Sequence, residues 1–151
     1  MLQNEIYSKQ ALGNAGQISK AEHAFLATQT GVAVNDIKVG SAVGIGTNQG
    51  EITNTNLTAD NFLGFCVKDR LINAVSDTDI YPSGSNVTAI TKGSIYIKAP
   101  ATATQGQAVN ITSAGVVSFG TVGSGAFDTG WRVSVGGASG DVIEITTTYK
   151  G

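Results

Sequence analysis

The chain has 151 residues and a formal net charge of −2, which fits one domain and argues against a protein that binds the phosphate backbone of nucleic acids. Only 13% of the residues are charged, well below the usual share, whereas 41% are hydrophobic, which excludes intrinsic disorder. One cysteine excludes an internal disulfide, and the sequence shows neither a secretory leader nor an apolar run of the ~20 residues that a membrane span needs. A surface of Thr, Ser, Asn, Gln and Gly is poorly protected against association, so this composition suits a protein that its neighbours cover.

Residues 1–30 differ from the rest of the chain because they show no strand-like alternation. Gly13 and Gly16 interrupt any long helix, and weakly helical patches are expected only around residues 5–11 and 19–27. We interpret residues 1–30 as an extended N-terminal arm, either a docking arm, which we favour, or a frayed terminus. In the docking interpretation, the side chains expected at a protein interface are Tyr7, Ile18, Phe25 and Leu26.

Residues 31–151 are typical of short strands joined by glycine turns. In the segment Ser94–Lys98, for example, Ile95 and Ile97 alternate with residues expected on the opposite face. About nine such strands, with no amphipathic helix between them, predict an all-β fold: a single antiparallel β-barrel or β-sandwich preceded by the arm. The expected strands are 41–46, 51–55, 62–67, 87–91, 94–98, 108–111, 116–119, 131–135 and 142–149.

The inward-facing positions of these strands predict the hydrophobic core. Phe62 and Phe65 differ in phase, so one of them is expected at a strand end or at a bulge. The expected core residues are Val43, Ile45, Phe62, Phe65, Val67, Ile95, Ile97, Val109, Ile111, Val133, Val135, Ile143 and Ile145.

The residues that carry chemistry do not assemble into a catalytic or metal-binding set. His23 is the only histidine and Cys66 the only cysteine, so the chain cannot build a zinc cluster, and nothing near His23 resembles a nucleophile turn. We expect His23 at the surface or in an interface, and Cys66, within an apolar run, as a buried and inert thiol. Asp77 and Asp79 alternate as calcium ligands can, but an ordinary solvated loop is favoured because the later Gly and Glu are missing. The prediction is no enzyme, no cofactor and no metal.

Several sequence segments follow one another in a recognisable order: Asp36–Val43, Phe62–Val67, Thr91–Ala99, Gln105–Val109, Trp131–Val135 and Asp141–Ile145. Over about residues 31–149 this order resembles the capsid cement, or head decoration, proteins of tailed bacteriophages. In that family a Lys-Gly hairpin, here Lys92-Gly93, and a Gly-x-Ala-Val strand start, here Gly40–Val43 and Gly106–Val109, occupy similar places.

The resemblance implies a β-barrel or sandwich that sits on the outer surface of an icosahedral head and clamps adjacent major capsid subunits. It implies the major capsid protein as partner, self-association as a dimer or trimer, and no nucleic-acid or membrane partner. The protein would be made in the host cytoplasm and located on the outer capsid surface of the virion.

A carbohydrate-binding or adhesin-type β module is the alternative function. It would need aromatic side chains gathered as a stacking platform on one sheet face. The candidates for that platform are Trp131, Tyr96, Tyr81 and Tyr149.

Overall fold

The computed structural model describes residues 13–20, 26–68 and 80–149. Within these ranges the regular secondary structure consists of β-strands alone, which confirms the all-β prediction. The strands are β1 (Ile18–Lys20), β2 (Ala27–Ala33), β3 (Ile37–Lys38), β4 (Ala42–Ile45), β5 (Glu51–Thr53), β6 (Phe62–Cys66), β7 (Ile80–Tyr81), β8 (Asn86–Lys92), β9 (Ser94–Lys98), β10 (Ala108–Thr112), β11 (Val117–Phe119), β12 (Ala126–Val135) and β13 (Val142–Thr146).

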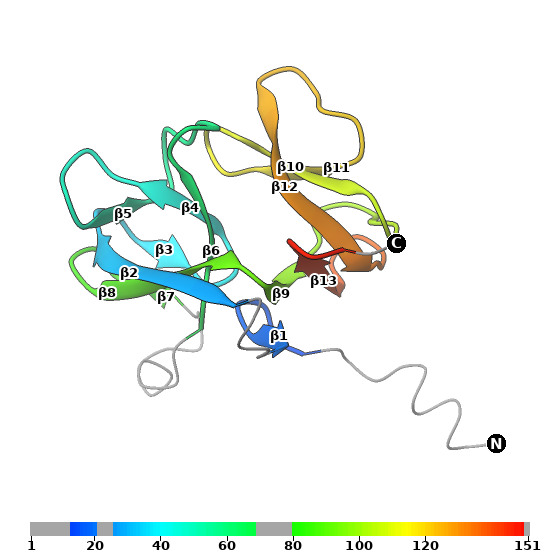
Figure 1. The fold of residues 1–151 in the computed structure, drawn as a ribbon, viewed down its shortest axis with the longest axis horizontal. Coiled ribbons are helices and arrows are strands. Elements are labelled where there is room, and N and C mark those ends of the chain that lie inside the picture. The colour runs from blue at the N-terminus through cyan, green and yellow to red at the C-terminus, as the bar shows by residue number, and fades with distance from the viewer. Residues whose placement is uncertain (1–12, 21–25, 69–79, 150–151) are drawn as a thin grey trace.

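One part of the fold is a closed barrel with the strand order β2-β5-β4-β6-β8 (Figure 1). β8 returns to pair with β2, which places Ile90 opposite Thr28 and Val87 opposite Gly31 and closes the cylinder. The pairings are antiparallel except that of β2 with β5, which is parallel. Closure removes the free edges that an open sheet would leave.

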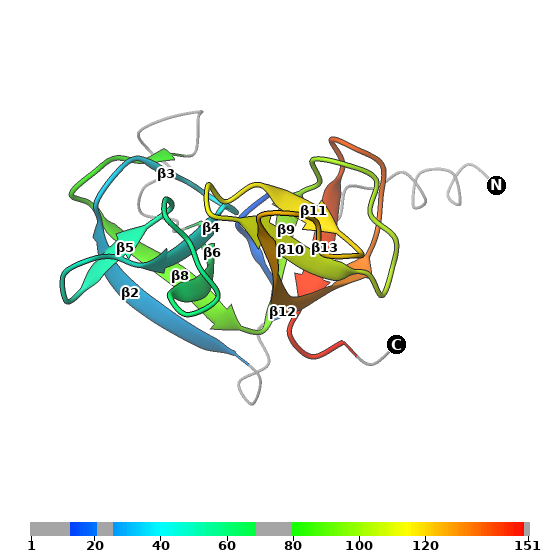
Figure 2. The ribbon, with the colours of Figure 1, turned by 90° about the horizontal axis from the view of Figure 1, so that it is seen from above.

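The other part is an open six-stranded sheet with the order β1-β9-β13-β12-β10-β11. Figures 1 and 2 show it beside the barrel. Gly93 alone separates β8 of the barrel from β9 of the sheet, so the chain passes directly from one part to the other. β3 and β7 form a separate two-stranded sheet. The fold is therefore more than the single barrel or sandwich of the prediction, because a second sheet adjoins the barrel.

The barrel and the six-stranded sheet share one hydrophobic core. Its larger cluster of buried residues combines side chains of β4, β6 and β8 with side chains of β9, β10, β12 and β13. At the centre Phe65 meets Trp131 edge to face, with 5.2 Å between the ring centroids. Phe62 extends this aromatic contact, at 5.8 Å from Phe65 and 6.0 Å from Phe127. A second cluster, which includes Cys66, fills the barrel interior.

All nine predicted strands are present, but four strands lie outside the prediction: β1, β2, β3 and β7. Two of these correct the interpretation of residues 1–30. Ile18–Lys20 pairs with β9, and Ala27–Thr30 belongs to the barrel strand β2, so these residues are strand and not extended arm or weak helix. The remainder of that range, residues 1–12 and 21–25, lies outside the described residues.

Most of the predicted core is buried, but Ile45 and Val135 are 45% and 39% exposed. Ile45 is the last residue of β4, and its side chain lines an open cleft. Val135 is exposed because the register of β12 against β13 shifts between Val133 and Val135, which reverses the phase of the alternation. Phe62 and Val67 are only half-buried. The bulge expected near Phe62 is present, as a register shift of β4 against β6.

Residues 13–17 connect the two parts of the fold. The N–H of Gly16 donates to the C=O of Tyr96 in the sheet, and the C=O of Gly16 accepts from the N–H of Lys68 beside the barrel, both at 2.8 Å. Gly16 is buried, with φ of +83°, and a Cβ there would lie 2.9 Å from the Cβ of Val39. The segment therefore fits closely between barrel and sheet, and only glycine suits this place.

We predict that Gly16→Ala lowers the free energy of unfolding by roughly 2–5 kcal/mol, because it adds a close contact to the cost of the left-handed backbone. Gly84→Ala is the matched control: Gly84 has φ of +88° and nothing within 4 Å of the added Cβ. It should cost only the backbone strain of about 1–2 kcal/mol. Urea unfolding of both variants measures the difference, and equal losses would show that residue 16 is not tightly enclosed.

Candidate interaction surface

The described residues hold no cluster of metal-ligating side chains. No group of three or more His, Cys, Asp or Glu side chains gathers anywhere within them. His23, Asp77 and Asp79 lie outside these residues, so their predicted roles stay predictions. No helix of the described chain is long and apolar enough to cross a membrane.

Cys66 is the buried thiol that the sequence predicts. It is 1% exposed, inside the barrel cluster, and unpaired. Burial disfavours the thiolate and raises the pKa of Cys66 to about 12. A nucleophilic or metal-binding cysteine needs the opposite shift, so Cys66 is a packing residue.

The aromatic platform of the alternative function is not formed. Trp131 and Tyr81 are 1% and 2% exposed, and each belongs to a different core cluster. Tyr96 and Tyr149 are half-buried. Because two of these rings are enclosed in the core, the four cannot present the open face on which a sugar ring would stack.

The most distinctive surface is the edge of the six-stranded sheet at β11. β11 pairs only with β10 among the described strands, with Ser118 opposite Asn110. The ladder continues beyond both ends of β11, since Thr112 N–H donates to Val116 C=O at 3.1 Å and Gly120 N–H donates to Ala108 C=O at 2.9 Å. The edge therefore runs from Val116 to Gly120.

The register decides which main-chain groups of this edge face outward. In an antiparallel pair, hydrogen-bonded and non-hydrogen-bonded residue pairs alternate. Because Val116 and Gly120 bond to β10, so does Ser118, and the N–H and C=O groups of Val117 and Phe119 point away from it. The side chains of Val117 and Phe119 pack against the larger core cluster, which holds this edge in place.

The edge lies in a part of the chain that carries no charge. From Ala99 to Phe127 the sequence contains no Asp, Glu, Lys, Arg or His. Two large apolar side chains flank the edge in the open: Val116 is 59% exposed and Val122 is 44% exposed. We call residues 116–122 the β11 edge surface.

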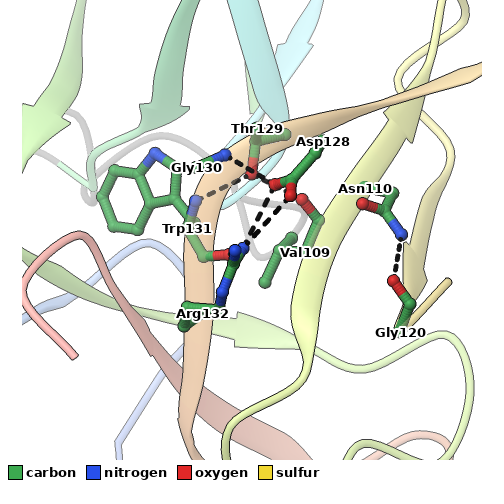
Figure 3. Close-up of polar contacts among 8 residues, drawn as sticks. All are labelled: Val109, Asn110, Gly120, Asp128, Thr129, Gly130, Trp131 and Arg132. Atoms are coloured by element: carbon green, nitrogen blue, oxygen red, sulfur yellow. Dashed lines mark hydrogen bonds and ion pairs between the residues drawn. The ribbon is translucent and has the colours of Figure 1, made fainter. Parts of the chain in front are cut away.

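Side chains of β10 and β12 fix the strands behind this surface (Figure 3). Asn110 is fully buried, and its Nδ2 donates to the C=O of Gly120 at 2.9 Å, which anchors the end of the edge. Its Oδ1 has no partner among the described residues. The hydrogen bond from Asn110 therefore helps to hold Gly120 at the end of the ladder.

β12 is bulged just before Trp131, whose side chain packs in the larger core cluster. Arg132 is opposite Ala108, whereas Asp128 is opposite Asn110, so β12 has extra residues in this interval. The Thr129 hydroxyl donates to the C=O of Val109 at 2.6 Å and accepts from the N–H of Trp131 at 3.2 Å (Figure 3). Side-chain hydrogen bonds therefore replace the main-chain ladder where the bulge interrupts it.

A second surface is an open cleft of about 620 Å³ at one end of the barrel. Two exposed apolar side chains, Val34 and Ile45, line it together with the carboxylates of Glu51 and Asp60. The side chain and the main-chain N–H of Asn48 donate to Glu51, both at 2.9 Å, and hold the pKa of that carboxyl below its usual value. Its remaining lining residues are Gly46, Thr47, Asn48, Thr53, Thr55, Asn56 and Asn61.

The predicted interface residues are not gathered at either surface. Ile18 and Leu26 are half-buried and pack against the larger core cluster. Tyr7 and Phe25 lie outside the described residues. An interface role for these four residues stays a prediction, and the β11 edge surface was missed although the uncharged run is visible in the sequence.

In a comparison with models of known protein families, residues 2–148 match the phage family described as structural cement protein (E217 gp24/Pam3 gp6). The chain belongs to this cement family. Membership confirms the predicted resemblance and supports a structural role in the phage capsid. The family is one of structural proteins and not of enzymes.

Comparison with solved structures finds a similarity between this cement-family chain and the N base of head fiber gp8.5 of bacteriophage phi29. The two are 10% identical, with a TM-score of 0.48, and the match covers 82% of this chain and 94% of that one. A search of curated proteins finds no matching sequence.

Thr129→Val should lower the free energy of unfolding by about 1–3 kcal/mol, because it leaves the C=O of Val109 and the N–H of Trp131 without their side-chain partner. The valine has nearly the shape of threonine, so the loss reports the hydrogen bonds. Thr121→Val, at an exposed position in the loop after the edge, is the control and should change stability by less than about 0.5 kcal/mol. Equal effects in thermal unfolding would show that Thr129 does not hold the bulge.

We predict that Cys66 reacts with a thiol reagent at neutral pH only after unfolding. The pH dependence has a defined sign, since the folded pKa of about 12 exceeds the unfolded value near 9.0. Below pH 9 the thiol is neutral in both states and contributes no pH dependence; between pH 9 and 12 the unfolded thiol ionises first, so the Cys66 contribution lowers stability as pH rises. Cys66→Ser lacks this titration and is the control. Rapid labelling of the folded protein would contradict the prediction.

Proposed function

We propose that this protein binds the outer surface of an icosahedral phage head and stabilises the contacts between major capsid subunits. Membership of the cement family supports a place in the capsid. The observation that carries the surface-binding role is the uncharged β11 edge surface with its exposed Val116 and Val122. A strand edge without charged side chains can pair with a strand of another chain, which suits a protein contact.

The energetics suit a protein that acts in many copies. A contact of ~800 Å² per partner is ordinary for a specific protein interface, and each copy needs no more. A ligand that binds only the assembled state stabilises that state by mass action, so many modest contacts over a shell raise its stability together. The proposal includes synthesis in the host cytoplasm, action as a dimer or trimer, and neither nucleic acid nor membrane as partner.

The test is to add the purified protein to heads assembled without it. We expect it to sediment with the heads and to raise the temperature at which they disrupt, measured by calorimetry. Unassembled major capsid protein is the control and should bind at least about tenfold more weakly, because it lacks the seams between subunits. A protein that stays in the supernatant, or that leaves the disruption temperature unchanged, would contradict the proposed function.

A further inference from the structure

We infer that the β11 edge surface is a strand-docking site, at which an extended, uncharged segment of the capsid partner adds to the six-stranded sheet beside β11. The inference rests on the proposed function and specifies how that surface binds. An added strand would pair with the outward N–H and C=O groups of Val117 and Phe119.

The absence of protection along this edge supports the inference. Exposed edges usually carry a lysine, a proline, an inward-pointing charge or a bulge, which keep other strands from pairing with them. The sequence from Val116 to Val122 contains none of these residues, and the pairing of β11 with β10 is regular. β11 is short, but Val116 and Gly120 extend its ladder at both ends.

The other edge of the same sheet differs. It is formed by β1, whose pairing with β9 is irregular between Ile18 and Lys20. An irregular ladder is a poorer template for another strand, because the partner cannot keep a constant register along it. The regular edge at β11 is therefore the better of the two for strand addition.

The side chains around the edge define the chemistry of the occupant. Val116 and Val122 would contact the added segment, and no charged side chain between Ala99 and Phe127 is present to pair with a charge on it. A charged residue in the docked part would lose its water without gaining a partner. The segment is therefore extended and carries apolar or small uncharged side chains.

A capsid segment fits this edge better than a second copy of the chain. Two copies joined only through β11 would share a short ladder between Val116 and Gly120, which offers far less than the ~1,000 Å² that a stable specific interface needs. A shell can contact the edge and the rest of the protein surface at once. Pairing between copies is accordingly an outcome that the experiment must distinguish.

The test uses the full chain and heads assembled without it. Val117→Pro removes an outward N–H while leaving the bonds of Ser118 to β10, and proline is tolerated at such edge positions. Val122→Lys adds a charge beside the edge. We expect each to weaken head binding by about tenfold or more in a sedimentation assay. The matched control is Val32→Lys on the barrel, since Val32 is 43% exposed against 44% for Val122, and it should bind as the unchanged chain does.

Hydrogen exchange provides a readout on the unchanged chain, which covers the case in which Val117→Pro does not fold. On heads, the amides of a peptide spanning residues 116–120 should exchange at least about tenfold more slowly, while those of β2 stay unchanged. Unchanged exchange at 116–120, or full binding by both edge variants, overturns the inference and leaves the proposed function standing. If the unchanged chain does not bind heads, both fail. If Val117→Pro alters only the oligomeric state of the free protein, a second copy is the occupant and the inference is overturned.

Discussion

The edge-to-face contact between Phe65 and Trp131 is the point at which a barrel and a sheet become one structure. Neither part encloses these rings alone, because Phe65 comes from β6 of the barrel and Trp131 from β12 of the sheet. The Thr129 hydroxyl ties the main chain at Trp131 to Val109 in β10, beside this contact. β12 pairs with β10, and β10 pairs with β11, so the β11 edge surface is connected to this aromatic contact through neighbouring strands.

The sequence predicts the strands well where glycine turns separate runs with one buried face, as in β9 with Ile95 and Ile97. It fails where that signal is missing. β2 is exposed along most of its length, so Ala27–Ala33 shows no apolar alternation although it closes the barrel. β3 and β7 have only two residues each. Val135 was misplaced because a shift in register is a property of the pairing and not of one strand.

The β11 edge surface shows a different limit of prediction from sequence. The uncharged run from Ala99 to Phe127 can be read in the sequence, but whether β11 is central or at an edge depends on the order of strands from distant parts of the chain. Trp131 illustrates the same point: as a residue type it suits both a sugar-binding platform and a core, and only its packing against Phe65 decides for the core.

The strand order also has a consequence for the time course of folding. β13 lies between β9 and β12, so the two halves of the sheet are not joined until Val142–Thr146 is available, and β1 must wait for its partner β9. Contacts between such distant residues form late and slowly, typically in milliseconds to seconds for β proteins. During translation β1 therefore lacks its partner strand until Ser94–Lys98 has been made. The uncharged residues around β11 then meet other nascent chains without electrostatic repulsion, which favours aggregation during synthesis.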